Sequence, residues 1–256
     1  MKTLIALTKK ELLGQFRTWR VLIFSILFVL FGLMNPAVAK LTPWLLDVLS
    51  ESLAGSGMTV TATTVSALDS WVQFFKNMPM ALIAFILLEG NIFTGEYQKG
   101  TLVLSLTKGI ARYKVIVSKA LVLVLLWTVG YWLCFGITYG CNAFFWDNSV
   151  AQHLLFSVVC WWLLGLWVIG LMVLFSALFR SFTGVLAGTG GIALASYLLG
   201  LLPKIGRFFP TYLANGSALI FGVTERKTYM AALAIAVAAA IAFFAVSIPV
   251  FNKKEL

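Results

Sequence analysis

Long stretches without a charged side chain recur along this sequence. Five of them contain 19 to 32 residues. They are 21–39, 120–146, 148–179, 181–203 and 228–252. An apolar helix needs about 20 residues to cross the hydrocarbon core of a bilayer, and a water-soluble domain has no use for so many segments that are hydrophobic on every side. The pattern predicts an integral membrane protein.

A sixth segment, 77–95, is equally long but carries Glu89, the only acidic residue inside a predicted span. We therefore expect an all-α polytopic membrane protein in which six transmembrane helices form one domain over residues 1–256. The expected spans are about 21–39, 77–95, 117–140, 153–179, 182–202 and 229–251. The composition agrees, because only 11% of the residues are charged, whereas soluble domains average about 25%.

Residues 1–20, which precede the first span, follow a different pattern. Their apolar residues recur at helical spacing. These are Leu4, Ile5, Leu7, Leu12, Leu13 and Phe16. The pattern predicts an amphipathic interfacial helix whose lysines face anionic lipid; a loose basic tail is the alternative. The next apolar run is longer than the core of a signal peptide, so we expect a retained anchor helix.

The net charge of +10 indicates topology rather than nucleic-acid binding. If both termini are cytoplasmic, 13 of the 19 Lys and Arg residues lie on that side, as the positive-inside rule requires. The remaining six are Lys40, Lys76, Lys204, Arg207, Arg226 and Lys227. Four of these lie in the connection 203–227, where Pro203 and Pro210 suggest a broken or re-entrant segment.

Chemistry-bearing residues are scarce. Cys134, Cys141 and Cys160 lie in or beside the third and fourth spans without metal-ligand spacing, and we expect them to be packing residues. His153, the single histidine, starts the fourth span and is expected to be an interfacial polar residue. The sequence contains no phosphate-binding loop and no hydrolase or zinc-protease motif. We expect no enzyme active site, metal or cofactor in this chain, so any ATP must bind elsewhere.

The most informative polar stretch follows the second span. It begins with an E-x-x-x-G-T-L pattern formed by Glu96, Gly100, Thr101 and Leu102. An apolar stretch and the basic residue Arg112 come next, and Lys119 marks the entry to the third span. This arrangement resembles the membrane subunits of ABC-2 type ABC exporters. The interfacial helix, the six spans, the large first external loop and the irregular last external connection resemble that family as well.

The resemblance implies the ABC-2 (type V) exporter fold and a cytoplasmic coupling segment, 96–115, that docks on a separate ATPase. The residues expected to serve this coupling are Glu96, Gly100, Thr101, Leu102, Lys108 and Arg112. Two copies of the ATPase would bind ATP and Mg, and a second permease copy would complete a homodimer. Gly100 permits a sharp turn, Glu96 can cap or pair at a helix end, and Lys108 and Arg112 can face one surface. An ordinary solvated loop is the alternative.

The fifth span carries small residues along one helical face. They are Gly184, Gly188, Gly191 and Ala195. Small residues let helices approach closely in lipid. Two interpretations stay open: a contact between subunits, as in the family, whose first and fifth helices meet in the dimer, and packing within one subunit.

Glu89 and the segment 40–76 also leave alternatives open. A carboxylate in a helix that crosses the membrane is costly; Glu89 either pairs structurally or contacts a substrate or proton. The segment 40–76 is expected to be an external loop with two short helices, its aromatic residues being interface anchors or part of a lid.

These observations predict a multi-pass permease of a bacterial plasma membrane, with cytoplasmic termini and contacts to lipid but not to nucleic acid. Because the spans are aromatic-rich and offer few polar groups, we expect export of an amphipathic or hydrophobic substrate, such as a peptide, antibiotic or lipid. A secondary transporter is the first alternative, although that class usually shows repeated halves and several buried ionisable groups. The second alternative is a membrane anchor or sensor that transports nothing.

Overall fold

The structure is a computed structural model that describes residues 2–53, 65–98, 100, 107 and 109–254. Its long helices are α2 (Arg20–Leu53), α3 (Ala67–Glu89), α6 (Arg112–Phe145), α7 (Leu154–Leu178), α8 (Phe182–Gly200) and α10 (Arg226–Lys253). The shorter ones are α1 (Lys2–Arg17), α4 (Thr94–Gln98) and α9 (Gly216–Ile220), with 3-10 helices η2 (Asn148–Val150), η3 (Gly206–Phe208) and η4 (Pro210–Ala214). Within the described ranges there is no strand, and six helices are long and apolar enough to cross a membrane. The predicted all-α membrane fold is confirmed.

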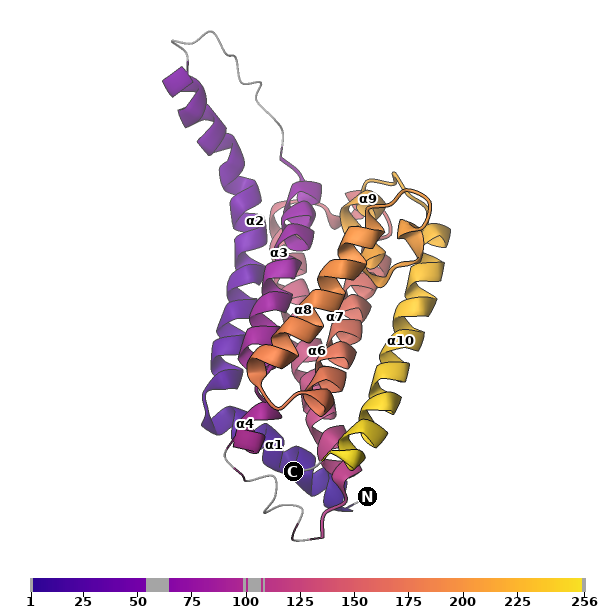
Figure 1. Cartoon of the computed structure of the whole chain (residues 1–256). Coiled ribbons are helices and arrows are strands. Elements are labelled where there is room, and N and C mark those ends of the chain that lie inside the picture. The colour runs from indigo at the N-terminus through magenta and orange to yellow at the C-terminus, as the bar shows by residue number, and fades with distance from the viewer. Residues whose placement is uncertain (1, 54–64, 99, 101–106, 108, 255–256) are drawn as a thin grey trace.

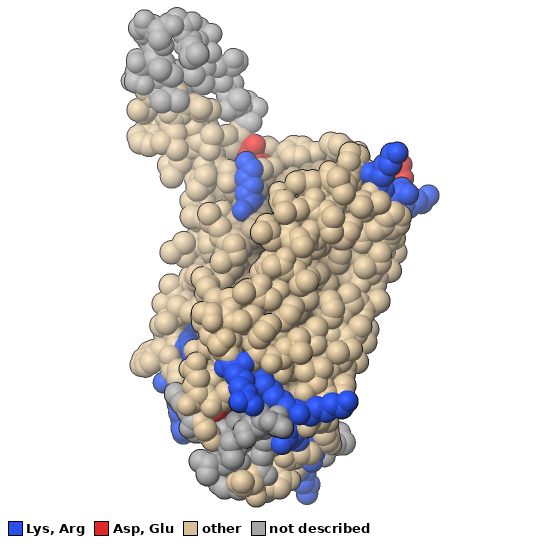
Figure 2. Space-filling view, in the orientation of Figure 1, with Lys and Arg blue, Asp and Glu red and all other residues tan. Residues whose placement is uncertain are grey.

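The long helices form a bundle with two distinct ends (Figure 1). Both chain termini lie at one end, here called the terminal end, where α1 runs across the bundle. The 3-10 helices η3 and η4 and the short α9 lie at the opposite end, here called the α9 end. Lys and Arg side chains form a band at the terminal end, while the middle of the visible face is largely uncharged (Figure 2).

Helix α1 has the features expected of an interfacial helix. It lies across the ends of the spanning helices and packs mainly on α6 (Figure 1). Ile5, Leu13 and Phe16 remain exposed in the single chain. Apolar side chains that protrude beside lysines suit the boundary between headgroups and acyl chains.

The segment expected to be an external loop, 40–76, is helical over much of its described length. Helix α2 continues without a break to Leu53 and contains Pro36 and Pro43. Helix α3 begins at Ala67 because the Ser66 hydroxyl accepts a hydrogen bond from a backbone N–H of its first turn, while the Asp69 carboxylate accepts one from the Ser66 N–H. Two extended spans thus replace the two short helices expected there; residues 54–64 lie outside the described part.

The second candidate span, Ala67–Gln98, consists of two helices. Helix α3 stops at Glu89, and a turn leads to the five-residue α4. The backbone N–H of Gly90 donates to the carbonyl of Ile86 and closes the last turn. Glu89 therefore lies at the end of α3, near the terminal end of the bundle.

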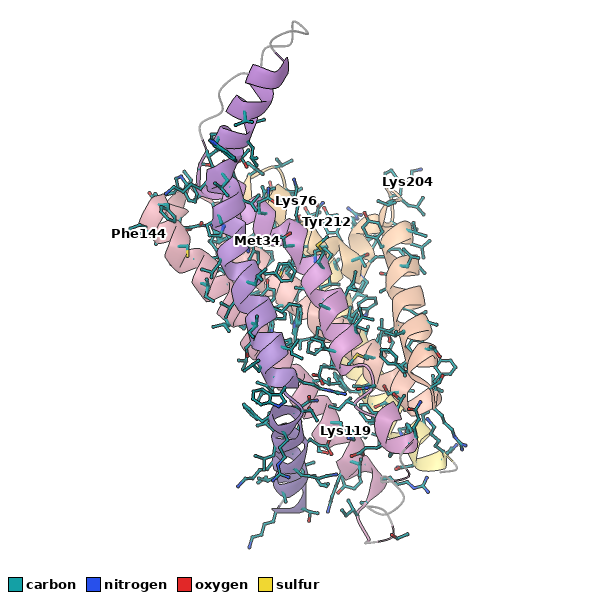
Figure 3. All side chains as sticks on the ribbon, turned by 90° about the vertical axis from the view of Figure 1, so that its left-hand side faces the viewer. Met34, Lys76, Lys119, Phe144, Lys204 and Tyr212 are labelled. Atoms are coloured by element: carbon teal, nitrogen blue, oxygen red, sulfur yellow. The ribbon has the colours of Figure 1, made fainter. Side chains whose placement is uncertain are left out.

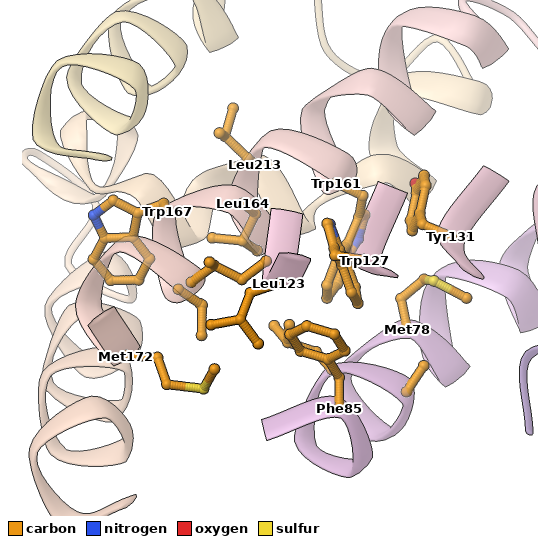
Figure 4. Close-up of a cluster of buried hydrophobic side chains, with 14 of the residues drawn as sticks. Met78, Phe85, Leu123, Trp127, Tyr131, Trp161, Leu164, Trp167, Met172 and Leu213 are labelled. Atoms are coloured by element: carbon orange, nitrogen blue, oxygen red, sulfur yellow. The ribbon is translucent and has the colours of Figure 1, made fainter. Parts of the chain in front are cut away.

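The core is an aromatic cluster where α3, α6 and α7 meet (Figure 4). Trp127 of α6 lies against Gly165 of α7, and the ring leaves no room for a Cβ atom at that position. The polar edges of the rings are bonded to backbone carbonyls: Trp127 Nε1 donates to Trp162 O at 3.1 Å, and the Tyr131 hydroxyl donates to Val158 O at 2.7 Å. Such rings can be buried because both their apolar and polar parts have partners.

The connection 203–227 is the irregular segment that the prolines predicted. It consists of η3, η4 and α9, which cover the end of the bundle. Its own residues Leu213, Leu219 and Ile220 are buried, while its basic residues Lys204 and Arg207 are exposed. Figure 3 shows Lys204 at the opposite end of the molecule from Lys119. The segment is a cap whose charges point away from the core.

A polar network inside the bundle was not expected from the sequence. Asn77 Nδ2 donates to Asn35 Oδ1 at 2.8 Å, and Asn35 Nδ2 donates to Thr138 Oγ1 at 3.1 Å. The Thr138 hydroxyl in turn donates to Gly32 O at 3.0 Å. Pro36 has no N–H, so the carbonyl four residues earlier, that of Gly32, has no partner within its own helix. Thr138 supplies the missing donor.

We expect Thr138→Val to lower the free energy of unfolding by about 1 to 3 kcal/mol, because it leaves buried acceptor and donor groups without partners. Thr138→Ser, which keeps the hydroxyl, should lose much less. Denaturant unfolding of the detergent-solubilised protein measures both. Thr138→Val should lower the free energy of unfolding by less in a Pro36→Ala background, because the alanine at position 36 has an N–H that can donate to the Gly32 carbonyl. An equal loss in both backgrounds would contradict this account.

Candidate functional site

A cluster of four charged side chains joins three helices at the terminal end. Lys119 Nζ of α6 lies 2.7 Å from Glu11 Oε2 of α1 and 3.1 Å from Glu96 Oε2 of α4. Lys10 of α1 lies 3.4 Å from Glu96 Oε1 and 3.5 Å from Glu11 Oε1. Lys119 also donates to the carbonyl of Ile92 at 3.0 Å. We call these four charged residues the anchor cluster.

Burial makes this cluster energetically important. The Lys119 side chain is only 1% exposed, whereas Lys10 is 57% exposed at the rim. A buried ammonium group without a counter-charge would cost several kcal/mol, so its carboxylate partners are required rather than optional. Burial lowers the pKa of Lys10, but the carboxylates of Glu96 and Glu11 outweigh it, and that pKa is raised. The cluster therefore holds the α4 segment firmly against α1 and α6.

Glu89 lies next to this cluster and is buried. Gln15 Nε2 of α1 donates to Glu89 Oε2 at 2.5 Å, and the positive charge of Arg20 acts on the same carboxylate. A polar cavity of about 310 Å³ lies alongside, and Gln15, Arg20 and Asn91 are among its lining residues. Glu89 thus links the end of α3 to the interfacial helix.

Three of the six predicted coupling residues belong to the part of the chain that the structure describes: Glu96, Gly100 and Arg112. Thr101, Leu102 and Lys108 lie outside the described residues. Glu96 belongs to the anchor cluster, and Gly100 has a positive φ of 65°, which glycine adopts without strain.

Arg112, another of the predicted coupling residues, bonds to the end of α10. Its Nη1 donates to the carbonyls of Asn252 at 3.0 Å and Lys254 at 2.6 Å. The last carbonyls of a helix lack intrahelical donors and carry partial negative charge, so they attract a guanidinium group. Arg112 joins the start of α6 to the end of α10.

The small-residue face of α8 is used in two ways. A Cβ atom added at Gly184 would lie 2.9 Å from the Phe179 ring, and one at Gly188 would lie 2.5 Å from the Phe175 ring. These two glycines face aromatic rings of this same chain. Gly191 has open space around it, and Ala195 is exposed. Packing within one chain therefore accounts for half of the face.

The remaining candidate groups lie apart from one another. Cys134 and Cys160 are buried and Cys141 is half-buried; all three are free thiols. His153 Nδ1 contacts the Arg226 guanidinium at 2.6 Å at the start of α7 and α10. Among the described residues, no group of three His, Cys, Asp or Glu side chains is arranged to hold a metal ion.

The fold and these contacts define a multi-pass membrane protein whose terminal end is joined by buried ion pairs. A family model described as ABC-2 family transporter protein matches residues 5–256. Because this match covers almost the whole sequence, the chain belongs to the ABC-2 transporter family and is the membrane component, or permease, of a transporter. No curated protein matches the chain. Members of this family are membrane subunits that associate with an ABC ATPase.

Sequence reasoning found Glu96 but not its partners. Glu11 and Lys119 are 108 positions apart, and Gln15 and Glu89 are 74 apart. The one available signal was Lys119, a cation two residues inside the predicted third span, which a membrane helix carries only with a partner.

We expect Lys119→Gln to lower the free energy of unfolding by about 3 to 5 kcal/mol, because it leaves Glu11 and Glu96 without their buried counter-charge. Lys9→Gln, which removes an exposed cation from the same end, should change it by less than about 0.5 kcal/mol. Denaturant unfolding in detergent checks both. If both variants lose the same small amount of unfolding free energy, water replaces the Lys119 ammonium group in the cluster.

Proposed function

We propose that this chain is the membrane subunit of an ABC exporter, that two copies form the translocation path, and that a separate ATP-binding subunit drives it. The anchor cluster is the observation that carries the proposal. It fixes Glu96, the first residue of the segment that resembles a coupling segment, to helices α1 and α6 by ion pairs of 3.1 to 3.4 Å.

These contacts give the segment 96–115 mechanical connections at both of its ends. Glu96 joins its beginning to α1 and α6, and Arg112 joins its end to α10. A displacement of the segment by a docked partner would therefore move three helices together. Since packed helices shift as units rather than deform continuously, ATP-driven motion of the partner would reach the membrane part of the protein.

The partner ATPase would hold ATP and Mg, and its site of docking requires the terminal end to be cytoplasmic. The band of basic residues at that end supports this orientation (Figure 2). Glu89, paired to Gln15 near the same end, fits a structural pairing role better than contact with a substrate. Largely apolar spans favour an amphipathic or hydrophobic substrate such as a peptide, antibiotic or lipid.

The pull-down of an ATPase from the native host tests the coupling proposal. We expect the wild-type chain to recover a protein with a phosphate-binding loop, and Leu102→Asp to reduce its recovery about tenfold, a loss of about 1.4 kcal/mol. Glu96→Gln should also reduce recovery, because it weakens the attachment of the segment to Lys119. Quantitative mass spectrometry of the purified complexes gives the ratio.

Lys204→Gln at the α9 end is the matched control and should leave recovery unchanged. Recovery of no nucleotide-binding protein with the wild-type chain would return the secondary-transporter and anchor alternatives. If the Leu102→Asp variant recovers as much ATPase as the wild-type chain does, the ATPase is still the partner but docks on another surface.

We further propose that the open half of the α8 face meets a second copy of the chain. Ala195→Cys should then form a disulfide-linked dimer under mild oxidation in native membranes, seen as a doubled mass on a non-reducing gel. Ala242→Cys, an exposed position on α10, should remain monomeric under the same conditions. Cross-linking at Ala242 and not at Ala195 would place the dimer on the exposed face of α10.

A further inference from the structure

Basic side chains gather where α6 and α10 meet at the terminal end. Arg112 and Lys254 bond to backbone carbonyls, and Lys114 and Lys253 lie beside them in sequence. In the part of the chain that the structure describes, the ion pairs join Lys10 and Lys119 to Glu11 and Glu96. Arg112, Lys114, Lys253 and Lys254 are not among these pairs, and they form a basic corner.

Lys254 shows that the corner disfavours a further positive charge. Its Nζ donates to the Phe179 carbonyl at 2.9 Å and lies 4.3 Å from the centre of the Tyr97 ring. Burial, together with the nearby Arg180 guanidinium, lowers the pKa of Lys254 to about 8. An anion placed here would favour the charged form of Lys254.

An apolar groove begins at the same corner. It has a volume of about 400 Å³ and lies between α6, α7 and α10. Its lining includes Ile116, Ala120, Val124, Val173, Ile241 and Ile248. This volume lies within the range of about 300 to 1,000 Å³ that is usual for small-molecule sites.

Along α6 and α10, about one helical turn separates the groove wall from the basic residues. Ile116 lies one turn after Arg112, and Ile248 lies one turn before Asn252, whose carbonyl Arg112 holds at 3.0 Å. From Ile116 to Val124 the groove extends about 12 Å along α6, at 1.5 Å per residue. That depth approaches half of a hydrocarbon core about 30 Å thick. The groove thus passes from a cationic rim into the depth of one leaflet.

We propose that this α6–α10 groove binds an anionic glycerophospholipid of the leaflet at the terminal end, with its headgroup at Lys114 and Lys253 and an acyl chain along the groove. An acidic protein segment would satisfy the cations but not fill an apolar groove at this depth. A zwitterionic lipid would fill the groove but leave the cations without net counter-charge. The proposal rests on the membrane fold and not on the proposed ATPase coupling.

The test uses the purified full-length chain in mild detergent after delipidation. Phosphatidylglycerol and phosphatidylcholine with identical acyl chains are added, and native mass spectrometry counts the bound lipids. We expect phosphatidylglycerol to bind more tightly, and Lys114→Gln and Lys253→Gln each to weaken its binding about fivefold, as expected for about 1 kcal/mol per basic residue near a membrane surface. Binding of phosphatidylcholine should not change in these variants.

Ala245→Trp tests the apolar part, because Ala245 is an exposed residue of the groove wall that a larger side chain would fill. It should weaken binding of both lipids, while Ala242→Trp, outside the groove on the same helix, and Lys204→Gln at the α9 end should not. Soluble glycerophosphoglycerol should fail to compete. Equal binding of the two lipids, or competition by the soluble headgroup, would overturn the proposal.

Discussion

Polar groups inside the bundle depend on partners within the protein, because a bilayer core offers no water. This constraint explains features that look unrelated in the sequence. Pro36 removes a donor, and Thr138 replaces it with a hydrogen bond of 3.0 Å to Gly32 O. Trp127 and Tyr131 can be fully buried because both donate to carbonyls of α7. At the terminal end, Arg112 satisfies carbonyls that close α10.

The same constraint governs the anchor cluster, where the buried group is an ion. Lys119 can lie inside the bundle because two carboxylates, from α1 and α4, come within 3.1 Å of its ammonium group. Neither short helix buries much surface of its own, so the shared cation supplies a large part of what holds them in place. A segment attached in this way is rigid against the bundle yet close to its surface, which is the combination that a force-transmitting contact needs.

Much of the fold could be predicted from the sequence, because the rules that create spanning helices are local. Charge-free runs located five of the six spans, a run interrupted only by Glu89 located the sixth, and Pro203 and Pro210 indicated the irregular connection. Features whose structure depends on residues far apart in the sequence could not be predicted in this way. The helical extension of α2 beyond Lys40 depends on neighbouring helices, whereas the start of α3 at Ala67 depends on the capping box formed by Ser66 and Asp69. The Asn35–Asn77–Thr138 network, and the partners of Lys119, are invisible until the helices are placed together.

Burial within the single chain also limits where partners can bind. Helix α7 is the central helix, because 67% of its most apolar 18-residue stretch is buried. For α8 and α10 the buried share of that stretch is 17% and 22%. Such exposed spans must be covered by lipid or by another subunit. On the small-residue face of α8, the open positions Gly191 and Ala195 permit close approach of a second backbone. On α10, exposed residues border a groove with a basic rim, which suits a lipid. The two surfaces therefore differ in chemistry, and a dimer through α8 would leave the α10 groove open to the bilayer.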